Sequence, residues 1–141
     1  MKLLCFVLLS LLFTNNSVAN ESHQIKAVRT IIDAVNLKQP TLYVSVFAEN
    51  VQIYLEHTLK VDGKKSLLTN RTEHFAKHPR AKSVIQHLVE IDNKVIMHDH
   101  VWLDRDNGNA QDIVEVYTFE DGLIVRVDVI QPSDLFAQPV P

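Results

Sequence analysis

The last two apolar runs of the chain restrict its fold more than any other feature. Residues 113–119 and 123–130 are rich in β-branched and aromatic side chains, and only Glu120, Asp121 and Gly122 separate them. An Asp-Gly pair between two such runs predicts a β-hairpin. Both runs are apolar on both faces, which is typical of strands that are covered on two sides.

A carboxylate within this hairpin marks a candidate functional position. Glu115 shares one face of its strand with Ile113, Tyr117 and Phe119, because side chains two residues apart lie on the same face. A buried carboxylate is costly unless it is paired or used. Apolar surroundings also raise the pKa of a carboxyl group toward the range useful in acid/base chemistry. We therefore expect Glu115 to be the central group of a site.

Asp128 in the second strand allows two interpretations. It shares a face with Arg126, so the two can form a plain charge pair at the surface. Alternatively, Asp128 contributes to the same site as Glu115.

The first nineteen residues predict a signal peptide. Lys2 precedes an apolar run of eleven residues, 3–13, and Ser17, Val18 and Ala19 match a small-x-small cleavage site. We expect cleavage after Ala19 and export to the periplasm or the medium, with a retained N-terminal anchor as the alternative. A membrane-spanning helix needs about 20 apolar residues, so no stable span is expected after cleavage.

The remaining composition excludes several classes of protein. The single cysteine, Cys5, lies in the apolar run, so the mature chain has no disulfide, thiolate metal site or cysteine nucleophile. Removing Lys2 leaves 13 basic against 17 acidic side chains, a formal charge of −4, which does not favour binding to nucleic acid. With three glycines and no glycine-rich phosphate loop, nucleotide cofactors are not expected.

The order of elements predicts an α+β fold. Apolar residues at steps of three and four indicate helices over 21–37 and 41–48, and a third helix from an Asp62 cap to Pro79. Alternation predicts strands over 51–57, 81–91 and 94–103 before the hairpin. We expect a single domain over 20–132, in which helices cover one side of an antiparallel sheet, and a loose tail over 133–141.

Histidines provide the other candidate functional groups. Alternation puts His57 on the inward face of its strand, while His98 and His100 share one face of a later strand. The alternatives are a core histidine bonded to a backbone carbonyl and a polar strand rim. His74 and His78 are spaced i, i+4 on the third helix; such a pair can bind zinc, but helix-surface histidines are common.

These motifs together resemble the SnoaL-like branch of the nuclear transport factor 2-like superfamily. The resemblance covers about residues 23–132. It rests on the order of elements and on His57, the runs Val61-Asp62-Gly63 and Met97-His98-Asp99-His100, Glu115-Val116-Tyr117, Phe119-Glu120-Asp121-Gly122, and Asp128-Val129-Ile130-Gln131-Pro132. It implies a conical α+β fold, of nuclear transport factor 2-like or cystatin-like type, with three helices on a curved antiparallel sheet and a pocket between them.

The resemblance also implies candidate roles. His57, His98 and His100 match histidines common in this branch, Glu115 stands where an Asp is usual, and Val127 stands where a Trp commonly precedes the Asp that matches Asp128. Members include polyketide cyclases, ketosteroid isomerase, dehydratases and binding proteins without a known reaction, and many dimerise through the sheet. Because Val114, Val116, Val127 and Val129 are apolar, we expect a homodimer formed in this way.

These observations lead to two functional hypotheses. The first is an exported protein whose pocket binds a small apolar or carbonyl ligand. The second is a cofactor-free isomerase, aldol cyclase or dehydratase in which Glu115 acts with histidine partners. The expected catalytic set is Glu115, His57, His98, His100 and Asp128, and the expected ligand-binding aromatic residues are Tyr54, Tyr117, Phe119, Trp102 and Phe75. We expect no metal, unless the three histidines converge with Glu115 around a zinc ion.

Overall fold

The computed structural model describes residues 21–104 and 108–132. The predicted signal peptide, 1–19, and the predicted tail, 133–141, lie outside the described residues and stay predictions. No helix of the described part is long and apolar enough to cross a membrane. The elements, in chain order, are α1 His23–Leu37, α2 Pro40–Val44, β1 Phe47–Leu55, β2 Thr58–Asp62, α3 Lys64–Lys77, β3 Lys82–Ile91, β4 Lys94–Trp102, β5 Gln111–Glu120 and β6 Leu123–Ile130.

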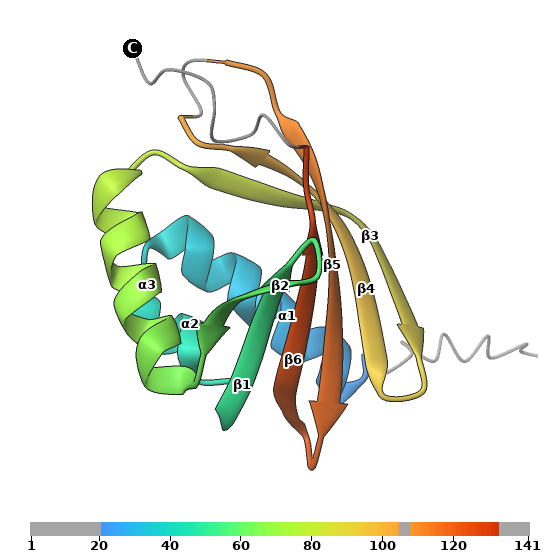
Figure 1. The fold of residues 1–141 in the computed structure, drawn as a ribbon. Coiled ribbons are helices and arrows are strands. Elements are labelled where there is room, and N and C mark those ends of the chain that lie inside the picture. The colour runs from blue at the N-terminus through green and yellow to red at the C-terminus, as the bar shows by residue number, and fades with distance from the viewer. Residues whose placement is uncertain (1–20, 105–107, 133–141) are drawn as a thin grey trace, which may run out of the picture.

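The six strands form one curved sheet in the order β2-β1-β6-β5-β4-β3, with the helices gathered on its concave side (Figure 1). The α+β class and the conical arrangement are confirmed. The sequence predicts an antiparallel sheet, and one strand pair differs from this prediction. β1 runs parallel to β6, with Ile53 opposite Val127, so the sheet is mixed.

The predicted hairpin is confirmed. β5 and β6 pair antiparallel, and Asp121 and Gly122 form the turn with positive φ angles of 49° and 78°. Two successive positive φ angles match the twist of the strands, and Gly adopts them without strain. A second hairpin joins β3 and β4 at Asp92, between the strands predicted over 81–91 and 94–103.

Strand β2 was not predicted from the sequence. It pairs antiparallel with β1 through a two-residue turn at Glu56 and His57, whose φ angles are 46° and 70°. His57 therefore lies in an exposed turn, and its predicted place on the inward strand face is wrong. The turn has neither Gly nor Asn, so it lacks the usual sequence pattern.

The helix boundaries follow from their caps. Ser22 begins α1 because its side chain accepts a hydrogen bond from the backbone N–H of Ile25, at 3.1 Å. Gly63, at φ 86°, precedes α3, so the predicted cap at Asp62 is wrong. The second helix is shorter than expected, because Phe47 pairs with Ile124 in the sheet.

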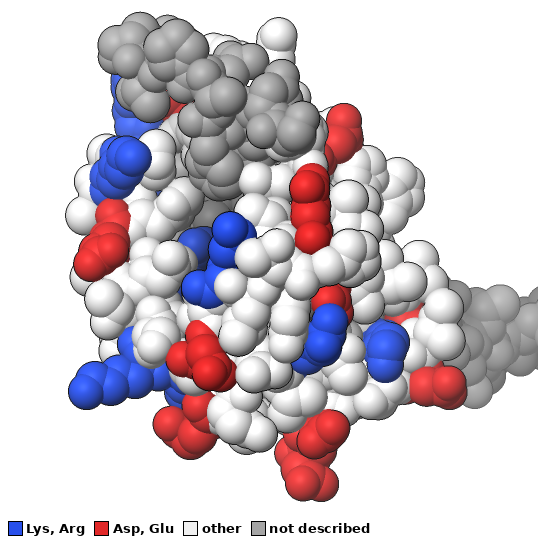
Figure 2. Space-filling model, in the orientation of Figure 1, with Lys and Arg blue, Asp and Glu red and all other residues white. Residues whose placement is uncertain are grey.

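The core lies between the concave face of the sheet and the helices. Its largest fully buried side chains are Tyr117, Phe47, Ile31, Leu67, Met97 and Ile124. On the face shown in Figure 2, basic and acidic side chains are intermingled.

The hairpin turn gives a test of this fold. We expect Gly122→Ala to lower the free energy of unfolding by about 1 kcal/mol, because a Cβ disfavours positive φ. The added Cβ would lie 3.5 Å from Nε2 of His23, an ordinary contact, so backbone strain alone should decide the effect. The measurement is urea unfolding of both proteins.

A matched control is Asp121→Asn, because Asn also tolerates a positive φ. Its change should stay within about 0.5 kcal/mol. Equal stability of Gly122→Ala and the parent protein would contradict the turn geometry.

Candidate functional site

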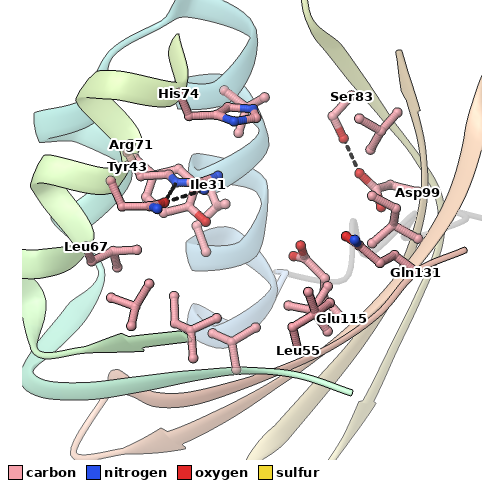
Figure 3. Close-up of a pocket in the computed structure, with 18 of the residues that line it drawn as sticks. Ile31, Tyr43, Leu55, Leu67, Arg71, His74, Ser83, Asp99, Glu115 and Gln131 are labelled. Atoms are coloured by element: carbon pink, nitrogen blue, oxygen red, sulfur yellow. Dashed lines mark hydrogen bonds between the residues drawn. The ribbon is translucent and has the colours of Figure 1, made fainter. Parts of the chain in front are cut away.

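A pocket of about 230 Å³ lies between the concave face of the sheet and the helices (Figure 3). Most of its wall is apolar, so water is poorly held there and an apolar molecule can replace it. The apolar lining includes Ile31, Ile32 and Val35 of α1, Leu67 and Phe75 of α3, and Ile53, Ile113, Val127 and Val129 of the sheet.

Two carboxyl groups interrupt the sheet side of this wall. Glu115 of β5 and Asp99 of β4 both project toward the helices (Figure 3). In the strand register Met97 lies opposite Glu115 and Asp99 lies opposite Ile113, so the two carboxyls are diagonal neighbours on one face.

Burial controls the protonation of Glu115. It raises the pKa of this carboxyl to about 7, and the negative charge of Asp99 adds to the rise. The phenol of Tyr117 donates a hydrogen bond to Oε2 of Glu115, which opposes the rise because it favours the ionised form. At neutral pH Glu115 can therefore both give and accept a proton.

Asp99 is the second acid of the pocket. Its Oδ2 accepts a hydrogen bond from the hydroxyl of Ser83, while its buried Oδ1 has no hydrogen-bond partner among the described residues. Burial raises the pKa of Asp99, which favours the neutral acid. A neutral carboxyl has an O–H group to donate, and a ligand in the pocket could accept it.

A pair of hydrogen bonds from α1 positions Ser83. The side chain of Asn36 donates to the backbone carbonyl of Ser83 at 2.9 Å and accepts from its backbone N–H at 2.9 Å. Ser83, at 3% exposure, is thereby held where its hydroxyl reaches Asp99.

The helix side of the pocket provides one cation and one neutral histidine. Arg71 lies with its guanidinium 5.6 Å from the centre of the Tyr43 ring, and its charge lowers the pKa of Glu115. Burial lowers the pKa of His74 to about 4, and the nearby Arg71 charge acts in the same direction. His74 is therefore neutral at physiological pH.

Only part of the predicted site is brought together. Glu115 and Phe75 line the pocket, and Tyr117 contacts Glu115 from the core. The face predicted for Glu115 is confirmed, since Ile113, Tyr117 and Phe119 are buried on it. Phe119 is packed in the core and is not among the pocket residues.

The predicted histidine partners of Glu115 lie elsewhere. His98 and His100 share a face as expected, but it is the outer face of the sheet, because Asp99 between them points inward. His57 lies in the β1–β2 turn. The three histidines therefore do not converge with Glu115, and the zinc site considered for these four residues is not formed.

The other predicted site residues also face outward. Arg126 donates two hydrogen bonds to Asp128, at 2.8 and 2.7 Å, so the charge-pair interpretation of Asp128 is confirmed. The guanidinium of Arg126 lies over the ring of Tyr54 at 4.0 Å. Trp102 packs edge-on against His100 on the outer face of β4.

Sequence reasoning missed Asp99, Ser83 and Arg71 as members of the site. For Arg71 the available pattern is its helical spacing from Leu67 and Phe75, which puts it on the apolar side of α3. For Asp99 the available pattern was its alternation with Val95 and Met97, which are both fully buried. Ser83 carried no comparable pattern.

Comparison with solved structures confirms the fold. A cystatin-fold protein from Novosphingobium aromaticivorans is 23% identical, with 79% of this chain and 99% of that chain covered and a TM-score of 0.70. A proposed SnoaL-like polyketide cyclase from Jannaschia sp. is 14% identical, with coverage of 84% and 92% and a TM-score of 0.68. A proposed ketosteroid isomerase from Kribbella flavida is 18% identical, with coverage of 84% and 83% and a TM-score of 0.66.

Sequence comparison assigns the family. No curated protein sequence matches the chain. The model of the SnoaL-like domain, however, matches residues 28–127, which include both pocket carboxyls. Over most of its length, therefore, this chain belongs to the SnoaL-like domain family.

Proposed function

We propose that the protein binds a small, largely apolar molecule that carries a carbonyl group. The observation that supports this most is the pocket itself, which combines apolar walls with two acids on its sheet side. Ligand sites are commonly apolar cavities with a few converging polar groups. The expected export of the protein remains part of this proposal as a prediction from the sequence.

The size of the pocket favours a small ligand. Cavities that hold drug-sized molecules measure about 300–1,000 Å³. This pocket measures about 230 Å³, just below that range.

The protonation of the acids favours a carbonyl ligand. Burial raises the pKa values of Asp99 and Glu115, which favours in each the neutral form that donates a hydrogen bond. A carbonyl oxygen is an acceptor without a proton of its own, so it suits such a donor. The carbonyl oxygen of a ligand would also provide a hydrogen-bond partner for the buried Oδ1 of Asp99.

Ligand binding can be tested with pairs of small compounds. Cyclic ketones and enones should raise the melting temperature of the protein, whereas hydrocarbons of the same size should raise it less. Val129→Phe should weaken the binding of the ketones at least about tenfold, because the larger side chain fills the pocket. The measurements are thermal shift and calorimetry.

The matched control is Val116→Phe on the outer face of β5, which should leave the affinity unchanged. Stabilisation by hydrocarbons and ketones alike would contradict the carbonyl preference. Full ketone affinity in Val129→Phe would contradict the pocket as the binding site.

A second function, acid/base catalysis, is favoured by a different observation. A buried carboxyl with a pKa of about 7 is matched to proton transfer at neutral pH. Tyr117 would stabilise the ionised form of Glu115, and Asp99 could donate to the carbonyl oxygen where negative charge develops. The solved structures proposed to be a polyketide cyclase and a ketosteroid isomerase have the same fold.

Catalysis predicts hydrogen exchange beside a bound carbonyl. In deuterated water, a ketone that binds should exchange its α-hydrogen faster with the protein than with buffer. Glu115→Gln should slow this exchange about 100-fold or more, because the amide cannot accept the proton. Nuclear magnetic resonance of the ketone measures the rate. Binding without exchange would reject the enzyme and leave the ligand-binding proposal intact.

Burial of Glu115 also predicts how stability depends on pH. The folded-state pKa of about 7 exceeds the ordinary value of 4.5, so only the unfolded chain ionises between these values. The contribution of Glu115 to the free energy of unfolding should therefore be highest below pH 4.5 and fall as the pH rises to about 7. Glu115→Gln removes this contribution and should be more stable than the parent above pH 7, by up to the order of 3 kcal/mol.

The measurement is urea unfolding across this pH range. The matched control is Glu120→Gln, an exposed residue at the end of the same strand, which should follow the parent curve. Equal pH dependence of Glu115→Gln and the parent would show that Glu115 is not the responsible group.

Dimerisation through the sheet stays a prediction, which light scattering can test. Two of the four valines that motivated it face inward, since Val127 and Val129 line the pocket. The outer face nevertheless exposes Val89, Ile91 and Ile130 beside Val114 and Val116.

A further inference from the structure

Three side chains with metal-binding atoms meet on the outer face of the sheet. One carboxylate oxygen, Oδ1 of Asp112, lies 2.7 Å from Nε2 of His98 and 3.0 Å from Nε2 of His100. All three atoms lie within 4.8 Å of one another. One carboxylate oxygen thus already lies close to both imidazole nitrogens.

Paired strands hold these side chains in place. His100 lies directly opposite Asp112 in the β4–β5 ladder, and His98 lies opposite Val114, one same-face position along. Both strands are interior to the sheet, because β3 and β6 flank them. Sites on such elements keep their geometry better than sites on loops.

A third histidine, His87, orients His98. Nδ1 of His87 lies 3.2 Å from Nδ1 of His98, and the two rings stack at an interplanar angle of 8°. If His98 carries its proton on Nδ1 and donates it to His87, then Nε2 of His98 is free as a ligand. Metal-binding histidines commonly donate their other ring N–H to a fixed acceptor in this way.

We propose that His98, His100 and Asp112 bind a divalent transition-metal ion, for which zinc is the best match. Two imidazole nitrogens and one carboxylate oxygen suit zinc, and water would complete four coordination. Metal–ligand distances of about 2.0–2.1 Å in a tetrahedron place the ligand atoms about 3.3 Å apart. From 2.7 and 3.0 Å, Oδ1 of Asp112 needs to move away from each imidazole nitrogen by only a few tenths of an ångström, while the two imidazole nitrogens, which lie within 4.8 Å of each other, adjust to the same spacing.

This site is separate from the pocket. Asp99, the residue between the two histidines, projects through the opposite face of β4. In a single chain the side chains of His98, His100 and Asp112 are 30%, 37% and 69% exposed, so an ion can reach them from solvent. The proposal therefore differs both from the metal-free protein expected from the sequence and from a zinc ion beside Glu115.

The test is a calorimetric titration of zinc into chelator-treated protein without an affinity tag. We expect one ion per chain with a dissociation constant of about 10 μM or lower, and a rise in melting temperature with zinc. His98→Gln and Asp112→Asn should each weaken binding at least tenfold. His87→Ala should weaken it about tenfold, because it only orients His98.

Two control variants remove other histidines. His57→Gln alters the exposed β1–β2 turn, and His78→Gln disrupts the His74–His78 pair, whose rings lie 4.8 Å apart. Both should bind zinc as the parent does. Circular dichroism should show that the cluster variants fold, as expected for exposed positions.

Three results would each overturn the proposal. The first is the absence of saturable zinc binding. The second is binding that survives both His98→Gln and Asp112→Asn. The third is binding that His78→Gln removes, which would assign the metal to α3.

Discussion

The pairing of β4 with β5 is the interaction on which the rest of the molecule depends. Val95, Met97 and Tyr117 are fully buried against the helices, and their burial sets which side of each strand faces inward. A slip of one residue would turn every side chain of a strand to the other face. The register that buries these apolar groups therefore also brings Asp99 and Glu115 into the pocket and directs His98 and His100 to the outside.

The parts of the fold that could be predicted are those with a local cause. The Asp121-Gly122 turn follows from residues that accept positive φ, and the burial of Glu115 follows from the aromatic residues on its own face. Strand β2 could not be predicted in this way, because Glu56 and His57 adopt positive φ without the residues that usually signal it. The parallel pairing of β1 and β6 joins segments far apart in sequence, and no local pattern encodes it.

The site was predictable only to the level of strand faces. Alternation showed that His98 and His100 share one side of β4 and that Asp99 lies on the other. Both sides carry apolar and polar residues, so the sequence did not reveal which one faces the helices. One choice between the two faces therefore decides whether the histidines or Asp99 lie beside Glu115, and the structure shows that it is Asp99.

The contact between Asn36 and Ser83 shows that a residue outside the pocket wall affects the groups inside it. Asn36 binds both backbone groups of Ser83, and the hydroxyl of Ser83 in turn donates a hydrogen bond to Asp99, which opposes the rise that burial causes in the pKa of Asp99. Asn36 does not line the pocket, yet it thus helps to set the acidity of Asp99, which does. A change on a supporting helix can consequently alter the acidity of this pocket while every residue that lines it stays the same.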